Sequence, residues 1–327
     1  MRAVNWLIVA LALSACSRPA EESTVPAARP EPVVVYASFE DENYLPSLFD
    51  DFTRETGIPV TVRHRPEHQI VGEVIANKGS PPADLLLTRS VHGVWRAADE
   101  GALRPLQSDT IATTVPRWFR DPDGYWTGIG FQSTEVVCSA ERRSDCDAVE
   151  AYEDLGKAEF RGRVCLSASS LAVNRTLVAG LIADRGARPA ELVVRGWVAN
   201  LALPPLESEA ALLQAVEAGT CGLAVVSGGA IHDYGKPTIA TAWPQPGYFD
   251  VWAVGINRHA RSPDAARSLA EWLVGDHAQV KQSEAAGQRP VTSAGKFELP
   301  EAGMRNAAIF GFHAADAAKL AERARWD

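Results

Sequence analysis

Residues 219–235 read GTCGLAVVSGGAIHDYG, and the interpretation of the whole chain starts from this stretch. A short apolar run at 223–226 stops at Ser227-Gly228-Gly229. Such a run, bounded by glycines, is typical of a buried strand whose carboxyl end opens into a loop. Ligands of open α/β sheets bind outside the carboxyl ends of the strands, so we expect a ligand at this loop.

Upstream of this stretch, short apolar runs alternate with helical patterns. Predicted strands at 33–36, 59–62 and 83–88 are separated by helical spacings at 44–56 and 70–76. This rhythm is that of a parallel sheet with crossover helices, whose strands end at one common edge. The same alternation continues to about residue 274, and the run from 128 to 137 is expected to cross into a second lobe. The sequence therefore predicts an α/β protein.

Composition and charge narrow the class of protein. The chain has 327 residues, 46% of them hydrophobic, which is typical of a globular protein of up to two domains. The formal net charge is −9, and no basic stripe is present. A nucleic-acid-binding face needs clustered lysines and arginines, so nucleic acid is excluded as the expected partner.

The N-terminus predicts export. Residues 1–15 combine Arg2, a short apolar core and small residues, the pattern of a cleaved signal peptide. The motif Leu13-Ser14-Ala15-Cys16 matches a bacterial lipobox, which predicts lipidation of Cys16 and a lipid-anchored protein in the periplasm. An ordinary signal peptide with an incidental cysteine is the alternative. Residues 16–32 are rich in Pro, Glu and Ala and predict a disordered tether.

Four further cysteines would then lie in an oxidising compartment, where disulfides form. Four cysteines allow three pairings, and the sequence cannot choose between them. The short spacing favours a local disulfide Cys138–Cys146, which leaves Cys165–Cys221 as the second pair. The spacings do not match a zinc site.

Several segments together resemble one family. They include VVVYASFEDE from residue 33, GSPPADLLLT from 79, RDPDGYWTGI from 120, FRGRVCLSASSLAVNRTLVAGLI from 160 and AVGINRHARSPDAARSLAEWLVGDHAQ from 253. In order and spacing the chain resembles the ferric-iron-binding solute-binding proteins of bacterial ABC importers over nearly all of residues 33–300.

The resemblance implies a two-lobed periplasmic-binding-protein fold, in which each lobe is a mixed, mostly parallel sheet flanked by helices. The expected N-terminal lobe comprises residues 33–130 and 249–290, and the C-terminal lobe comprises 131–248 and 291–327. A ligand cleft would lie between the lobes. The resemblance also implies that the protein binds a small-molecule solute and delivers it to an ABC permease in the inner membrane. We expect a monomer without enzymatic activity.

The family's iron ligands are not matched in this sequence. Ferric iron is a hard cation that prefers phenolate and carboxylate oxygens, and the resemblance places the family's tyrosine pair at Gly229 and Ala230. A further tyrosine position corresponds to Val173, and a glutamate position corresponds to Arg89. These replacements are expected to enlarge the cleft, and the Arg89 guanidinium is suited to an anion.

The leading hypothesis is therefore a cleft without a metal or other cofactor that binds an organic anion, a metal chelate or a partly apolar solute. The predicted ligand-binding residues are Ser38, Phe39, Glu40, Arg89, Trp126, Phe131, Ser170, Asn174, Ser227, Gly228 and Gly229.

Other interpretations stay open. Ferric iron, held by Glu40, Asp41 and Tyr234 with a synergistic anion, is one alternative, and a non-transport lipid carrier or sensor subunit is another. Arg89 can equally be a solvated or ion-paired surface residue, and Asn174 can simply cap a helix. His232-Asp233-Tyr234 suggests a turn, because no nucleophile motif accompanies it.

Overall fold

The structure is a computed structural model that describes residues 31–38, 44–76, 82–292 and 305–327. The predicted signal peptide at 1–15, Cys16 and nearly all of the predicted tether lie outside these ranges. Residues from Glu31 to Asp327 form one compact unit. Across the described ranges, no helix is both long enough and apolar enough to cross a lipid bilayer.

A mixed sheet runs through this unit in the strand order β2-β1-β3-β9-β5-β7-β6, with β4 paired to β9 and β8 paired to β5. Its strands are β1 (Val33–Ala37), β2 (Val60–His64), β3 (Leu85–Thr88), β4 (Leu103–Arg104), β5 (Trp126–Ser139), β6 (Val164–Cys165), β7 (Leu223–Ser227), β8 (Ile239–Ala242) and β9 (Phe249–Asn257). The pairs β1–β2, β1–β3 and β6–β7 are parallel, as the alternating sequence pattern predicts. The pairs that involve β5 or β9 are antiparallel.

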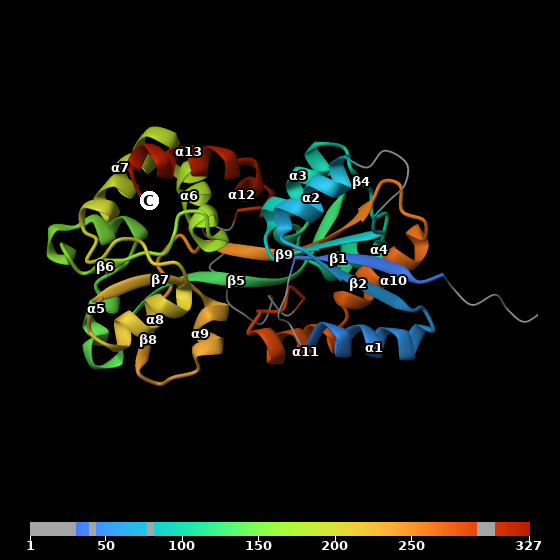
Figure 1. Ribbon diagram of the computed structural model, residues 1–327, viewed down its shortest axis with the longest axis horizontal. Helices are drawn as coiled ribbons and strands as arrows, with labels where there is room; N and C mark the ends of the chain where they lie inside the picture. Colours follow the sequence, from blue (N-terminus) through green and yellow to red (C-terminus); the bar gives the residue numbers. More distant parts are fainter. Residues whose placement is uncertain (1–30, 39–43, 77–81, 293–304) are drawn as a thin grey trace, which may run out of the picture. The chain divides into compact units, whose positions relative to one another are not determined.

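The long strand β5 joins the two parts of the sheet, as Figure 1 shows. Its first part, from Trp126 to Ser133, pairs with β9, and its last part pairs with β7 and β8. The register between β5 and β9 shifts between Gly128 and Gly130. The prediction that this segment crosses from one part of the fold to the other is confirmed. The predicted lobe boundaries at 130/131, inside β5, and at 248/249 stay a prediction.

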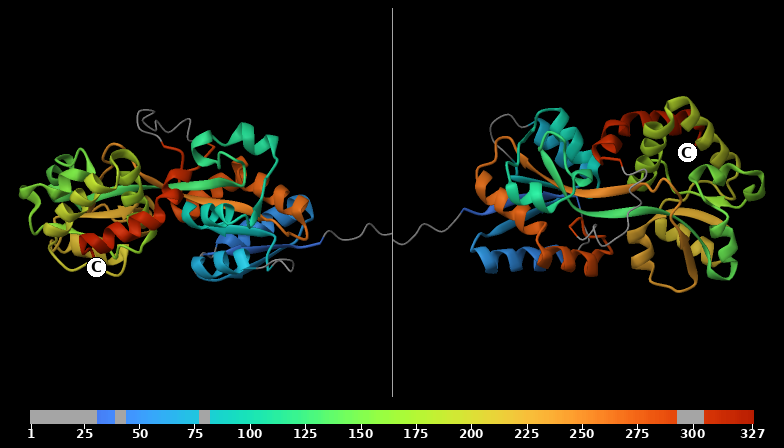
Figure 2. Two further views of the ribbon diagram at one scale, coloured as in Figure 1. Left: turned by 90° about the horizontal axis from the view of Figure 1, so that it is seen from above. Right: turned by 180° about the vertical axis from the view of Figure 1, so that it is seen from behind.

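Helices cover both faces of the sheet (Figures 1 and 2). The helices α2 and α3 lie on one face of β1 and β3, and α1 and α11 lie on the other. Beyond β5, the helices α6, α7 and α13 pack together, and α8 and α9 lie on the opposite face of β7. The helices are α1 (Tyr44–Thr56), α2 (Glu67–Ala76), α3 (Val91–Asp99), α4 (Asp109–Thr114), α5 (Arg143–Asp147), α6 (Ala172–Arg185), α7 (Ala187–Ala199), α8 (Glu209–Glu217), α9 (Gly228–Tyr234), α10 (Pro263–Leu273), α11 (Asp276–Ala286), α12 (Ala308–Phe312) and α13 (Ala314–Ala324), with short 3₁₀ helices at Arg117–Phe119, Ala140–Arg142, Tyr152–Gly156 and Ala158–Phe160.

One local prediction is wrong. The segment after β7 was expected to be a loop ending in a turn at His232-Asp233-Tyr234, but it forms the helix α9. Ser227 provides the reason, because its Oγ accepts a hydrogen bond from the Ala230 backbone amide at 3.2 Å and so caps the first turn. Gly235, with φ of +60°, ends the helix in the left-handed conformation that glycine adopts without strain.

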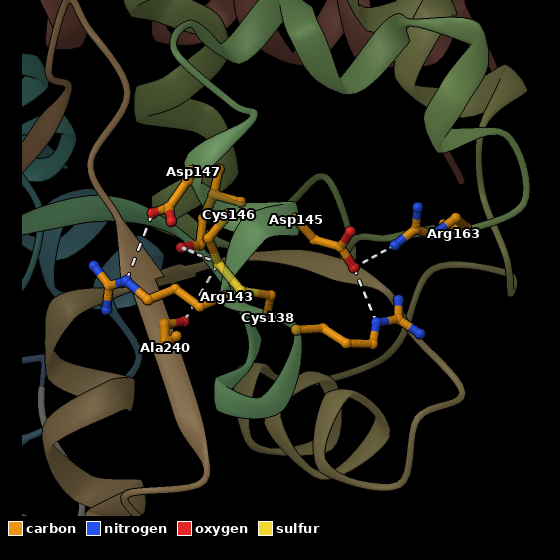
Figure 3. The surroundings of a disulfide bond; sticks show 9 residues. Cys138, Arg143, Asp145, Cys146, Asp147, Arg163 and Ala240 are labelled. Carbon is orange, nitrogen blue, oxygen red and sulfur yellow. Dashed lines mark hydrogen bonds and ion pairs between the residues drawn. A yellow bond between two sulfur atoms is a disulfide. The ribbon is translucent and has the colours of Figure 1, made fainter.

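Both favoured disulfides are present. Cys138 at the end of β5 is bonded to Cys146 in α5, and Cys165 in β6 is bonded to Cys221 just before β7. Figure 3 shows the first of them beside Asp145, which accepts hydrogen bonds from Arg142 and from Arg163. The disulfides therefore secure the segments that flank β7, the strand on which the predicted ligand loop depends.

Candidate ligand-binding site

A polar pocket of about 240 Å³ lies where β3, β7 and β9 approach the middle of β5. Its described lining combines one arginine, two carboxylates, three hydroxyl groups, one side-chain amide, a tryptophan ring and a short apolar wall. The lining residues are Arg89, Gln132, Ser133, Thr134, Leu171, Ala172, Val173, Glu209, Ser227, Asp250 and Trp252. The sequence-based expectation that the carboxyl end of β7 contributes to a ligand site agrees with the position of Ser227.

Arg89 is the cation of this pocket. It follows β3, and its backbone amide donates a hydrogen bond to the Oγ of Ser38 at 3.0 Å. The predicted meeting of the strand ends after β1 and β3 is therefore observed. The guanidinium carbon lies 5.1 Å from the centroid of the Trp252 ring, within cation–π range. Since Trp252 is 2% exposed, this rigid ring positions the cation against the pocket.

Asp250 is the more deeply buried of the two carboxylates in the pocket, with 7% of its surface exposed. Its Oδ1 accepts hydrogen bonds from the backbone amides of Val251 at 2.8 Å and Val91 at 3.2 Å, and from the Ser90 hydroxyl at 3.2 Å. Burial penalises the charged form and raises the pKa of Asp250 to about 7, and these hydrogen bonds only partly oppose the shift. Asp250 therefore titrates near neutral pH.

Glu209, at the start of α8, is the second carboxylate. It accepts hydrogen bonds from the backbone amide of Ser227 and, at 3.2 Å, from the Ser227 hydroxyl. Burial raises its pKa, while these hydrogen bonds and the charge of Arg89 pull it back. Glu209 thus fixes the end of β7 and shares the electrostatic environment of Arg89.

Further ionisable groups lie behind the pocket. Burial and the nearby charge of Asp250 raise the pKa of Glu67 to about 8, against the opposing charges of Arg175 and Arg89. His92 in α3 is buried, and burial together with the charge of Arg175 lowers its pKa to about 3, so it is neutral. Burial therefore favours the neutral forms of both Glu67 and His92.

The two glycines after Ser227 do not leave empty space. A Cβ atom at Gly229 would lie 2.3 Å from the Nε2 of Gln132, and one at Gly228 would lie 2.9 Å from the Oγ of Ser133. The expected enlargement of the cleft at Gly229 is therefore wrong, because the amide of Gln132 occupies the space that a larger residue there would need. The polar side chains of Gln132 and Ser133 in β5 form this part of the surface.

Several predicted site residues lie elsewhere. Trp126 and Phe131 are fully buried in the core, where Phe131 stacks on Phe119 with ring centroids 4.9 Å apart. Asn174 is also fully buried and donates hydrogen bonds to the Ser167 carbonyl at 3.1 Å, the Ser167 hydroxyl at 2.9 Å and the Ala168 carbonyl at 2.9 Å. It fixes the loop before α6, next to the residues Leu171, Ala172 and Val173 that form the pocket's apolar wall.

Other predicted residues lie at the border of the pocket or beyond the described ranges. Ser170 is exposed, immediately before the lining residue Leu171. Phe39, Glu40 and Asp41 lie outside the described residues.

Tyr234 is not part of the pocket lining. Its hydroxyl donates a hydrogen bond to Glu217 Oε2 at 2.5 Å and lies 3.4 Å from the Lys236 ammonium. Among the residues that the structure describes, no group of three or more His, Cys, Asp or Glu side chains is arranged to hold a metal ion.

The lining residues that the sequence interpretation missed come mainly from β5 and β9. Gln132, Ser133 and Thr134 interrupt an otherwise apolar strand, and Asp250 interrupts another. A polar residue inside a buried apolar run requires a partner or a function, and this signal could have identified them.

The family model for bacterial extracellular solute-binding proteins matches residues 47–296. The "Iron uptake protein A1" of Synechocystis is 28% identical over 75% of this chain and 71% of its own length. The "Fe(3+)-binding periplasmic protein" of Serratia marcescens is 25% identical over 76% of this chain and 75% of its own length. A solved Trichodesmium structure with iron and citrate ligands has the same fold, with a TM-score of 0.82 and 24% identity over 90% of this chain and 99% of that one.

These comparisons correct one expectation from the sequence. The prediction of a protein that works without a metal is contradicted, because the relatives are named for iron uptake and for binding Fe(3+). That prediction rested on the absence of tyrosines at Gly229, Ala230 and Val173. The two-lobed fold, in contrast, is confirmed by the similarity to solved binding proteins of this type.

Proposed function

This chain belongs to the bacterial extracellular solute-binding protein family, and we propose that it binds ferric iron as an anionic complex with a small oxygen-rich chelator. The sequence relatives named for iron support the metal. The pocket beside Arg89 supports the anionic complex. The protein acts by binding its solute rather than by catalysis, and it hands the solute to an ABC permease.

The observation that carries this proposal is a cationic guanidinium in a polar pocket whose described lining residues include the tyrosine position Val173 but no tyrosine. Ferric iron requires several anionic oxygens. The pocket supplies the carboxylates of Glu209 and Asp250, and both resist ionisation because they are buried. The chelator therefore supplies most of the oxygens around the iron, and the protein recognises the chelator.

Arg89 recognises the negative charge of the complex. Its planar fork of N–H donors matches a carboxylate in two-point geometry, and the Trp252 ring beneath it restricts its motion. The hydroxyls of Ser133, Thr134 and Ser227 complete a polar surface for the chelator's other oxygens. A negative complex also relieves the repulsion that a bare trivalent cation would experience beside Arg89.

The cellular setting belongs to the same proposal. The lipobox at Cys16 supports a lipid anchor that holds a monomer in the periplasm, close to the permease. Closure of the two lobes around the complex would be the movement that the permease detects, as in other periplasmic binding proteins.

Titration of the metal-free protein with ferric citrate, followed by tryptophan fluorescence and by iron analysis after gel filtration, tests the proposal. We expect one iron per chain. The Arg89→Ala variant should bind about tenfold more weakly or worse, because a hydrogen bond to a charged group contributes about 1.5–3 kcal/mol.

Arg267→Ala is the matched control, since Arg267 is a surface arginine on α10 that pairs with Asp264. It should bind like the wild type. If the wild type takes up no iron from ferric citrate or from any other ferric chelate tried, the proposal is wrong. Equal affinities of Arg89→Ala and the wild type would remove the role of Arg89.

A further inference from the structure

A second cavity of about 280 Å³ adjoins the pocket described above. Gln132 and Ser133 of β5 line both cavities, so the two meet at these residues. The remaining wall of the second cavity includes His232 of α9, Thr241 of β8 and Arg289, which follows α11. In Figure 1, α9, β8 and the end of α11 lie close to this part of β5.

Gly228 and Gly229 determine the shape of the junction. The Gln132 amide lies within 2.3 Å of where a Cβ of Gly229 would be, and the Ser133 hydroxyl lies 2.9 Å from the corresponding position of Gly228. Because positions 228 and 229 carry no side chains, the Gln132 amide and the Ser133 hydroxyl of β5 lie at the surface between the cavities. An elongated solute that passes through the junction would meet an amide and a hydroxyl there.

The second cavity has its own guanidinium. Arg289 is held in place because its backbone exchanges two hydrogen bonds with Phe131 of β5, at 2.9 and 2.8 Å. Its side chain lies 5.4 Å from the Trp243 ring centroid and pairs with Glu135 at 3.3 Å. Glu135 is 7% exposed and also accepts a hydrogen bond from Ser133, so its charge is compensated from two sides.

The arrangement repeats that of the first pocket. In each case an arginine lies over a tryptophan ring, and a buried carboxylate lines the same cavity, Asp250 in the first and Glu135 in the second. A guanidinium fork fixed in this way recognises a planar carboxylate. Two such forks in two adjoining cavities match a solute with acidic groups at both ends.

We propose that the solute is an elongated polycarboxylate chelate, with one acidic group at Arg89 and a second acidic group beside Arg289, Thr241 and His232. This inference rests on the proposed function, which it deepens by giving the chelator a length and two charged ends. The second cavity thereby becomes the part of the site that selects between chelators.

Two ferric complexes distinguish this selection from simple iron binding. Ferric citrate extends a carboxylate away from the metal, whereas ferric oxalate is compact and uses its carboxylates on the metal. The wild type should bind ferric citrate more tightly. Arg289→Gln should weaken ferric citrate about tenfold, the loss of one charge-assisted contact, and leave ferric oxalate unchanged.

Thr241→Val provides a second variant, because it removes a hydroxyl from the cavity wall at constant shape and does not touch the Arg289–Glu135 pair. It should reduce the preference for ferric citrate in the same direction, and it decides the question if Arg289→Gln does not fold. Arg267→Gln on the distant surface of α10 is the control and should change neither affinity.

The outcomes separate the two proposals. If the wild type binds ferric citrate but neither variant changes the ratio of the two affinities, the second cavity does not select the chelator, and the proposed function stands. A wild type that prefers ferric oxalate also overturns the inference. A wild type that binds neither complex overturns both proposals.

Discussion

The raised pKa of Asp250 predicts how the stability of the protein depends on pH. Its carboxyl group has a pKa of 3.8 when exposed and about 7 in the folded protein. The folded protein therefore holds this proton more tightly than the unfolded chain does. The contribution of Asp250 to stability is largest at low pH and declines as the pH rises, until it levels off above the folded pKa.

The size of this effect follows from the shift. A difference of roughly 3 pKa units corresponds to about 4 kcal/mol when both states are ionised. Between about pH 5 and about pH 8, some 2–3 kcal/mol of this penalty should develop. Asp250→Asn removes the ionisation, and the asparagine Oδ1 can still accept from the amides of Val91 and Val251. The variant should thus gain about 2–3 kcal/mol over the wild type across this pH interval.

Urea unfolding of both proteins, followed by tryptophan fluorescence at each pH, measures the difference. Asp264→Asn is the control, because the Asp264 side chain is 86% exposed. It should show no such change. Glu67 titrates differently in the two proteins, because the charge of Asp250 contributes to raising its pKa. The loss of that charge in Asp250→Asn changes the stability difference in the same direction. A stability difference between Asp250→Asn and the wild type that stays constant from about pH 5 to about pH 8 would refute the reasoning.

Three further predictions concern the scaffold. Replacing both Cys165 and Cys221 by serine opens a disulfide whose cysteines are 56 residues apart, which should cost about 4 kcal/mol in urea unfolding; a cost near zero would contradict the entropic argument. Gly180→Ala places a Cβ 2.4 Å from the buried ring of Tyr248, and we expect a loss of about 1–3 kcal/mol in the same assay. Asn174→Ala removes three hydrogen bonds to the loop before α6, so the free energy of unfolding should fall by about 2 kcal/mol. The affinity for ferric citrate should fall as well. An unchanged affinity would show that this loop does not contribute to binding.

Local patterns in the sequence identified much of the fold. Helix α1 begins and ends where its apolar spacing predicts, at Tyr44 and Thr56. The meeting of Ser38 with Arg89 also followed from the sequence, because parallel strands with right-handed crossovers end at one edge. These features depend on periodicity and handedness, which are properties of short segments.

The residues that line the pocket were harder to predict from the sequence. Asp250 was missed because a single carboxylate near the start of an apolar run has no periodicity of its own. The contact between Gln132 and Gly229 joins residues almost a hundred positions apart, and no local pattern encodes it. Trp126 and Phe131 were misplaced because aromatic residues near a cleft and aromatic residues in a core look alike in sequence.

The closeness of Gln132 to Gly229 also makes the two positions interdependent. A side chain at 229 would displace the Gln132 amide, because its Cβ would lie 2.3 Å from the Nε2 of Gln132. The amide is the end of a flexible side chain and can move aside, but it would then leave the surface that the two cavities share. A substitution at Gly229 would therefore act on both cavities at once, through Gln132 as well as through the new side chain.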